Sequence, residues 1–237
     1  MRLTRLIAGA TTAGLLGLVP VAAGTPAQAT DNLTTTTAIE SSERAVVYGD
    51  TVYITGDVAG SDGQSAYYGT VTLYRMQAGA SAWTPVATDD ASGYFGFYDI
   101  KPAANTLYKV LYSGYAATNP YEDNYAPSES APIKIGVQRK VTIRLKSAAL
   151  TVLGKVAPKY KHKLVIASRK VGTSYKRFRV VRTDSRSRFS VKLPAPRRRG
   201  ARLYFKLTIK GDSEYLGWTG KYYTYTYRGA ARTGVQR

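Results

Sequence analysis

Short runs of alternating apolar and polar residues follow one another along most of the chain. Residues 71–74 and 94–98 show this alternation in the first half, and residues 203–209 show it in the second. Successive side chains of a β-strand point to opposite faces, so the alternation predicts strands with one buried face. After Thr30, no window of helical length keeps an apolar stripe at the helical period. The pattern therefore predicts an all-β protein.

Clusters of turn-forming residues separate these runs. Gly, Ser and Asp fill residues 60–63, the run 89–93 is similar, and residues 102–105 read Pro-Ala-Ala-Asn. Short strands rich in Tyr, Val and Thr, with turn signals at regular spacing, are typical of β-sandwiches.

The stretch from Val46 to Gly114 is echoed about a hundred residues later, from Ala149 to Gly211. Gly-Asp-Val at 56–58 corresponds to Gly-Lys-Val at 154–156, and Thr-Asp recurs at 88–89 and at 183–184. A repeat of this length is a domain, because solenoid units span only about 20 to 50 residues. We predict two tandem sandwiches, at residues 30–137 and 138–237. Residues 133–145 contain few turn formers, so we expect a short linker.

Several short motifs resemble the immunoglobulin-like repeats of secreted proteins from high-GC Gram-positive bacteria. They are the two Gly-x-Val segments, Ser-Gly-Tyr-Phe at 92–95, residues 108–114, and Pro-Ser-Glu-Ser at 127–130. The second copy lacks Ser-Gly before Phe189. The resemblance implies a fold and an extracellular location. Such modules serve as spacers and as binding domains, so function has to be argued from a site.

The first 29 residues have the pattern of a cleaved signal peptide. Arg2 and Arg5 precede a largely apolar run at 6–21, and Ala-Gln-Ala at 27–29 forms a small-residue cleavage site. A membrane anchor is less favoured because Pro20 interrupts the run. The chain has no cysteine, which excludes disulfides and cysteine-bound metals. We predict a secreted, extracellular protein, released or retained non-covalently at the cell wall.

Charge divides the chain into two unlike halves. Residues 30–137 contain five Lys and Arg against twelve Asp and Glu, a net charge of −7. Residues 138–237 contain 27 against three, a net charge of +24. Repulsion among the positive charges of the second domain opposes its compaction, so a bound polyanion is expected to stabilise that domain.

We predict that the basic clusters of the second domain contact a polyanion, with affinity that falls as salt rises. Tyr160, Tyr175, Phe178 and Tyr204 are interleaved with them. The partner is an anionic cell-wall polymer or polysaccharide, with anionic lipid and extracellular DNA as other polyanions. No helix-turn-helix, zinc-finger or RNA-recognition signature is present, so sequence-specific nucleic-acid binding is not expected. The candidate residues are Lys155, Lys159, Lys161, Lys163, Lys176, Arg177, Arg179, Arg182, Arg186, Arg188, Arg197, Arg198, Arg199 and Arg202.

Two alternatives remain open. The charge can serve solubility alone, in which case the protein is a structural spacer or accessory module without a ligand. The acidic domain of one molecule can also meet the basic domain of another, which gives head-to-tail association.

Candidate chemistry is sparse, and we predict no catalytic residue, metal or cofactor. The sole histidine, His162, lies between two lysines and lacks an orienting carboxylate. Asp62, Asp89, Asp90, Glu122, Asp123 and Asn124 offer oxygen ligands for calcium, but turn-forming residues need no metal. Tyrosines at 67–68 and 222–227 suggest a sugar platform, although half-buried packing explains them better. The sequence therefore favours a non-enzymatic, secreted binding or adhesion module.

Overall fold

The computed structural model describes residues 30–146, 149–195, 200–227 and 230–235. The predicted signal peptide, 1–29, lies outside the described residues. The first half forms β1 (Asn32–Leu33), β2 (Thr35–Ser41), β3 (Ala45–Val47), β4 (Val52–Gly60), β5 (Thr70–Gln77), β6 (Thr84–Asp90), β7 (Phe95–Ile100), β8 (Thr106–Tyr112), β9 (Asn124–Tyr125), β10 (Ser128–Glu129) and β11 (Ile133–Gln138). The second half forms β12 (Lys140–Lys146), β13 (Thr151–Ala157), β14 (Leu164–Val171), β15 (Ser174–Arg182), β16 (Arg188–Lys192), β17 (Arg202–Ile209), β18 (Trp218–Tyr227) and β19 (Ala230–Val235).

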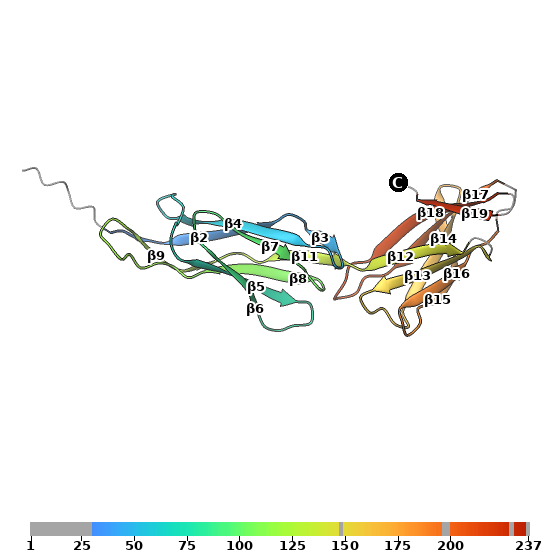
Figure 1. The fold of residues 1–237 in the computed structure, drawn as a ribbon, viewed down its shortest axis with the longest axis horizontal. Coiled ribbons are helices and arrows are strands. Elements are labelled where there is room, and N and C mark those ends of the chain that lie inside the picture. The colour runs from blue at the N-terminus through green and yellow to red at the C-terminus, as the bar shows by residue number, and fades with distance from the viewer. Residues whose placement is uncertain (1–29, 147–148, 196–199, 228–229, 236–237) are drawn as a thin grey trace, which may run out of the picture.

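The strands form two sandwiches placed end to end (Figure 1). In the first, the sheet β2-β4-β7 faces the sheet β3-β11-β8-β5-β6, in which β10 also pairs with β8. In the second, β12-β13-β16 faces β15-β14-β17-β18-β19. The small parallel pair β1-β9 extends the first sandwich. The prediction of an all-β fold with two tandem immunoglobulin-like sandwiches is confirmed.

The two sandwiches share one topology. Leaving out the short strands β1, β3, β9 and β10 and the last strand, each half has seven strands in which the first, second and fifth form one sheet. The fourth, third, sixth and seventh form the other, in that order. The sequence repeat therefore corresponds to a repeat of the whole strand order.

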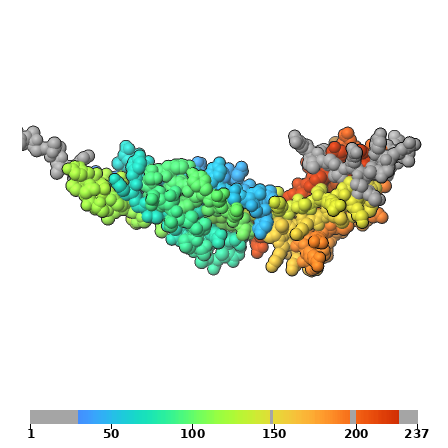
Figure 2. All heavy atoms as spheres, viewed as in Figure 1, coloured from blue at the N-terminus to red at the C-terminus, as the bar shows by residue number. Residues whose placement is uncertain are grey.

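Each sandwich has its own hydrophobic core. The first contains Ile54, Leu73 and Phe95, and the second contains Val165, Phe205 and Leu207, all nearly inaccessible to solvent. These residues occupy alternate positions of their strands, as the apolar pattern predicts. Figure 2 shows the result as two lobes joined at a narrow waist.

A glycine facing a phenylalanine ring explains one of the repeated motifs. Gly56 pairs with Phe95 across β4 and β7, and Gly154 pairs with Phe189 across β13 and β16. A Cβ atom at Gly56 would lie 2.6 Å from Cζ of Phe95, and one at Gly154 would lie 2.1 Å from Cζ of Phe189. In both copies the ring fills the space above a residue that has no side chain, so the glycine of the motif has the same structural place in each sandwich.

One residue separates the sandwiches along the chain. β11 ends at Gln138, β12 begins at Lys140, and Arg139 lies between them, only 4% exposed. The expected short linker is present, while the domain boundary at residues 137 and 138 stays a prediction. Within the described ranges, no helix combines the length and the hydrophobicity needed to cross a membrane.

Candidate functional site

The strands of the second sandwich contain no aspartate or glutamate. Its three carboxylates, Asp184, Asp212 and Glu214, lie in the connections between strands. Asp184 accepts hydrogen bonds from the backbone N–H groups of Arg188 and Arg186, both at 2.8 Å, and these bonds lower the pKa of its carboxyl group. Asp212 pairs with Arg139 at 2.9 Å. These two aspartates are therefore committed to a turn and to the junction, away from the sheet faces.

Three pairs of cations lie directly opposite each other on neighbouring strands. Lys155 faces Arg188 across β13 and β16, and Arg169 faces Lys176 across β14 and β15. Lys206 faces Lys221 across β17 and β18. Like charges in register destabilise a sheet by up to about 1 kcal/mol per pair. The described strands of the second sandwich hold no carboxylate, so these charges are not offset within the sheets.

The outer face of the sheet β12-β13-β16, here called the three-stranded face, is basic throughout. Its exposed cations are Lys140, Arg144, Lys146, Lys155, Arg188 and Lys192. A shallow cavity of about 390 Å³ lies between Arg144, Lys155 and Arg188, with Thr142 and Leu153 on its walls. The face offers guanidinium and ammonium donors around a depression.

The outer face of the sheet β15-β14-β17-β18-β19, here called the five-stranded face, combines cations with tyrosines. Lys170 lies 5.6 Å from the ring centroid of Tyr204, and Arg202 lies 5.4 Å from that of Tyr223. The Tyr223 and Tyr225 rings are stacked at 6.4 Å. These ring faces are turned toward one another or toward cations, and the cation–π contacts stabilise both groups. The charged ends of Lys170 and Arg202 therefore lie against tyrosine rings of the same face.

A further tyrosine ring extends this arrangement toward the edge strand β15. Lys206 lies 5.3 Å from the ring centroid of Tyr175 on β15. Arg177, two positions further along β15, pairs with Ser168 of β14, which in turn pairs with Lys206 of β17. The five-stranded face is therefore continuous from β15 to β18.

A third group of cations, here called the turn cluster, gathers at the end of the second sandwich near the junction. Its members are exposed: Lys159, Lys161, Lys163, Arg182 and Arg186. The backbone N–H of Tyr160 donates to Ser187 Oγ at 2.8 Å, and Arg182 donates to the carbonyl of His162 at 3.0 Å. The first bond joins the turn at 158–163 to the turn at 184–187, and the second joins it to the end of β15.

The structure distributes the predicted residues over several surfaces instead of one patch. Lys155 and Arg188 meet on the three-stranded face, and Arg177 and Arg202 lie on the five-stranded face. Lys176 pairs with Arg169 on the edge strand, and Arg179 is exposed beside the irregular register of β14 and β15. Arg197, Arg198 and Arg199 lie outside the described residues.

Sequence reasoning left several cations of these faces out of the site. Lys206 and Lys221 are isolated in the sequence, so a search for dense clusters misses them. The alternation of the two strands could have identified them, because Lys206 and Lys221 are each flanked by residues of the inner face and must therefore lie on the outer one.

The candidate catalytic and metal-binding groups are not assembled into a site. His162 is exposed in a turn with a φ of 55°. Within the described residues, no three His, Cys, Asp or Glu side chains come close enough to hold a metal ion.

The carboxylates weighed as calcium ligands cap turns of the first sandwich instead. Glu122 accepts hydrogen bonds from the Tyr115 hydroxyl at 2.6 Å and from the Thr118 backbone at 3.1 Å. These bonds lower the pKa of Glu122 to about 2. Asp62 accepts from the backbone of Gln64, and Asp89 accepts from Asp90 and Gly96. Asp123 and Asn124 accept from Asp31 and Ala117.

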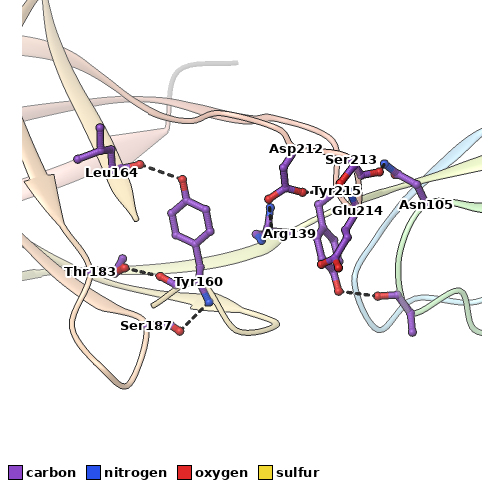
Figure 3. A network of polar contacts seen from close by, with 11 residues as sticks. Asn105, Arg139, Tyr160, Leu164, Thr183, Ser187, Asp212, Ser213, Glu214 and Tyr215 are labelled. Carbon is purple, nitrogen blue, oxygen red and sulfur yellow. Dashed lines mark hydrogen bonds and ion pairs between the residues drawn. The ribbon is translucent and has the colours of Figure 1, made fainter. Parts of the chain in front are cut away.

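The junction between the sandwiches is built around Arg139 (Figure 3). Its guanidinium lies 4.0 Å from the Tyr215 ring centroid and 4.9 Å from that of Tyr160, and it donates to Asp212 at 2.9 Å. Its Nε and Nη1 are buried without a hydrogen-bond partner among the described residues. The π-faces of the two rings stabilise the charge that these atoms carry.

Burial and pairing set the ionisation of the groups around Arg139. Burial raises the pKa of Tyr160 and of Tyr215, so both rings stay neutral. Burial also acts to raise the pKa of Asp212, but the hydrogen bond and the charge of Arg139, with two backbone bonds, outweigh it and lower that pKa. The junction therefore contains an ionised pair between neutral rings.

Direct hydrogen bonds fasten the loop at 210–217 to the first sandwich. The Asn105 side chain donates to the Ser213 carbonyl at 3.0 Å and accepts from the Val137 backbone at 2.8 Å. The Tyr215 hydroxyl donates to the Ala103 carbonyl at 2.9 Å (Figure 3). Tyr215 also packs with Ala104 and Val137 in a small buried cluster. These contacts restrict bending between the sandwiches.

Comparison with known proteins yields no family model and no curated protein that matches the chain. Among solved structures, a tetra-tandem repeat from the extending region of a large adhesion protein is similar, with 10% identity over 80% of this chain and a TM-score of 0.36. A two-domain fibronectin type III segment of chicken tenascin has 15% identity over 77%, with a TM-score of 0.36. The Yersinia pseudotuberculosis adhesin InvE has 12% identity over 79%, with a TM-score of 0.32. The chain spans 49%, 95% and 57% of these three structures, respectively.

Proposed function

We propose that the protein is a secreted, non-enzymatic module that attaches to an anionic polymer of the cell envelope or its matrix. The second sandwich makes the contact, through the three-stranded face, the five-stranded face and the turn cluster. The observation that carries the proposal is the in-register pairing of cations, as at Lys206 and Lys221, on strands without a carboxylate. An anionic chain laid across such pairs relieves their repulsion and releases its own counterions.

A structural spacer is the second candidate, and the junction favours it. The contacts of Arg139, Asn105 and Tyr215 hold two sandwiches in line, which suits a module that sets a distance. In that case the cations serve solubility alone.

Retention on three purified polyanions separates the two candidates. The full chain is applied to cell walls, double-stranded DNA and anionic lipid vesicles at low salt, and salt is then raised. We expect retention on at least one polyanion and release as the Debye length shrinks. The double variants Lys206→Gln/Lys221→Gln and Lys155→Gln/Arg188→Gln should elute at lower salt than the wild type.

The matched control removes the same charge from the first sandwich. Lys101 and Lys134 are exposed there, so Lys101→Gln/Lys134→Gln loses two cations without touching the proposed surfaces. It should elute with the wild type. Absence of retention on all three polyanions at low salt supports the spacer and rejects the polymer contact.

A further inference from the structure

Two exposed tyrosines lie on the outer face of the sheet β2-β4-β7, in the first sandwich, and a third, Tyr94, immediately precedes β7. Tyr94 is 57% exposed, Tyr98 is 67% exposed and Tyr53, on β4, is 53% exposed. Phe95 and Phe97 alternate with the first two and are buried in the core. The segment thus places its pure hydrocarbon rings inside and its hydroxylated rings outside.

A glycine beneath one of these rings lets it lie flat on the sheet. A Cβ atom at Gly96 would lie 2.8 Å from the Tyr98 hydroxyl oxygen and 3.0 Å from two of its ring carbons. The Tyr98 ring therefore rests over the backbone of Gly96 and still exposes most of its surface. Tyr53 lies beside it, with ring centroids 6.3 Å apart and an interplanar angle of 35°. The two rings form a broad aromatic surface open to solvent.

The surroundings of this aromatic surface are polar and acidic. Thr55 pairs with Gly96 on one side and with Glu40 on the other. Asp57, the next outward position of β4, pairs with Ala38 and is exposed. The strands β2, β4 and β7 contain no lysine or arginine. Carboxylates next to the rings repel anionic polymers, which distinguishes this face from the basic surfaces of the second sandwich.

We propose that this face binds a neutral glycan. The C–H groups of a pyranose ring pack against the electron-rich face of an aromatic ring, and its hydroxyls donate to neighbouring carboxylates. Tyr98 and Tyr53 supply the stacking surface, while Glu40 and Asp57 supply the acceptors. Apart from the tyrosines, the outward positions of these strands hold no apolar side chain larger than Ala38, so a ligand finds its apolar contact on the aromatic rings.

The test measures retention of the full chain on microcrystalline cellulose and on chitin beads. The buffer contains about 0.5 M NaCl, at which screening suppresses contacts made by the second sandwich. We expect retention on one of these glycans that does not change when salt is raised further. The variants Tyr98→Ala and Tyr53→Ala should each weaken binding about two- to tenfold.

Two further variants distinguish stacking on the Tyr98 ring from nonspecific adsorption through exposed tyrosines. Gly96→Ala keeps every tyrosine but lifts the Tyr98 ring, so it should weaken binding while the thermal unfolding temperature shows that the fold is intact. Tyr121→Ala removes a tyrosine that is 85% exposed in a loop, and it should bind as the wild type does. The proposal is overturned if the wild type is retained on neither glycan, or if Tyr121→Ala and Tyr98→Ala lose binding equally. Either result leaves the polyanion contact untouched, because the assay is run at high salt.

Discussion

Arg139 is the residue on which the junction depends most. Its charge is buried between the rings of Tyr160 and Tyr215, and only one of its nitrogens reaches Asp212. Arg139→Ala removes both ring contacts and leaves Asp212 without its partner. We expect a loss of about 1–3 kcal/mol in unfolding free energy and a wider range of inter-sandwich orientations.

Denaturant unfolding and residual dipolar couplings measure these two effects. The control is Arg144→Ala, because the Arg144 side chain is exposed on β12. Its unfolding free energy should change by no more than about 0.5 kcal/mol. Equal effects of the two substitutions would show that Arg139 has no special part in the junction.

Gly154 shows how one residue type can fix the fit between two strands. Its missing side chain leaves room for the ring of Phe189, and Gly56 does the same for Phe95. Gly154→Ala forces the ring aside in a filled core, so we expect a loss of about 1–3 kcal/mol in stability. Thermal unfolding checks this against Ser190→Ala, an exposed neighbour on β16, which should change little.

At the scale of elements, the sequence predicted the strands well because alternation records which side chains are buried. Leu203 to Ile209 and Val71 to Tyr74 lie within strands as expected. The pairing of cations could not be predicted from the sequence, because Lys206 and Lys221 are placed opposite each other only by the register of β17 and β18 across the loop at 210–217. Local composition carries no record of that register.

The same limit applies to the candidate site. The excess of cations and their location in the second half were evident from the charge counts, but clusters in the sequence are not clusters in space. Lys176 and Arg177 are adjacent in the chain, where they pair with Arg169 and Ser168, but successive side chains of a strand point to opposite faces of the sheet. Arg139 was missed because a single basic residue before a strand gives no sign that it will be buried.

Replacing one member of a like-charged pair should stabilise the sheet and weaken the proposed contact together. Lys221→Glu turns its pairing with Lys206 into an attraction, and we expect a gain of about 0.2–1 kcal/mol in unfolding free energy. Retention on the anionic polymer should fall at the same time. A variant that loses binding without gaining stability would indicate that the two lysines do not repel each other in the sheet.

At the scale of the molecule, the acidic and basic sandwiches are joined end to end by a short, packed junction (Figure 2). Its Asp212 has a lowered pKa, so the ionised form favours the junction. That contribution is complete above the ordinary carboxyl pKa of about 4 and is lost as pH falls through the lower value of the folded state.

Amide exchange at the junction tests this pH dependence. Protection of Asn105 and Leu216, whose backbone N–H groups bond to Glu214 and Val137, should decline below about pH 4. In Asp212→Asn the decline should disappear, because the carboxylate that pairs with Arg139 is gone. Protection that falls equally in both proteins would assign the effect to another group.

The salt dependence of the affinity for an anionic polymer is the most direct test of the contact proposed for the second sandwich. The dissociation constant of the full chain for a long-chain polyphosphate is measured between about 50 and 300 mM NaCl, where screening changes strongly. If the second sandwich binds polyanions through its cations, log affinity falls steeply and linearly with log salt, and the slope is shallower for Lys206→Gln/Lys221→Gln. An affinity that does not change with salt, or a variant slope equal to that of the wild type, would contradict it.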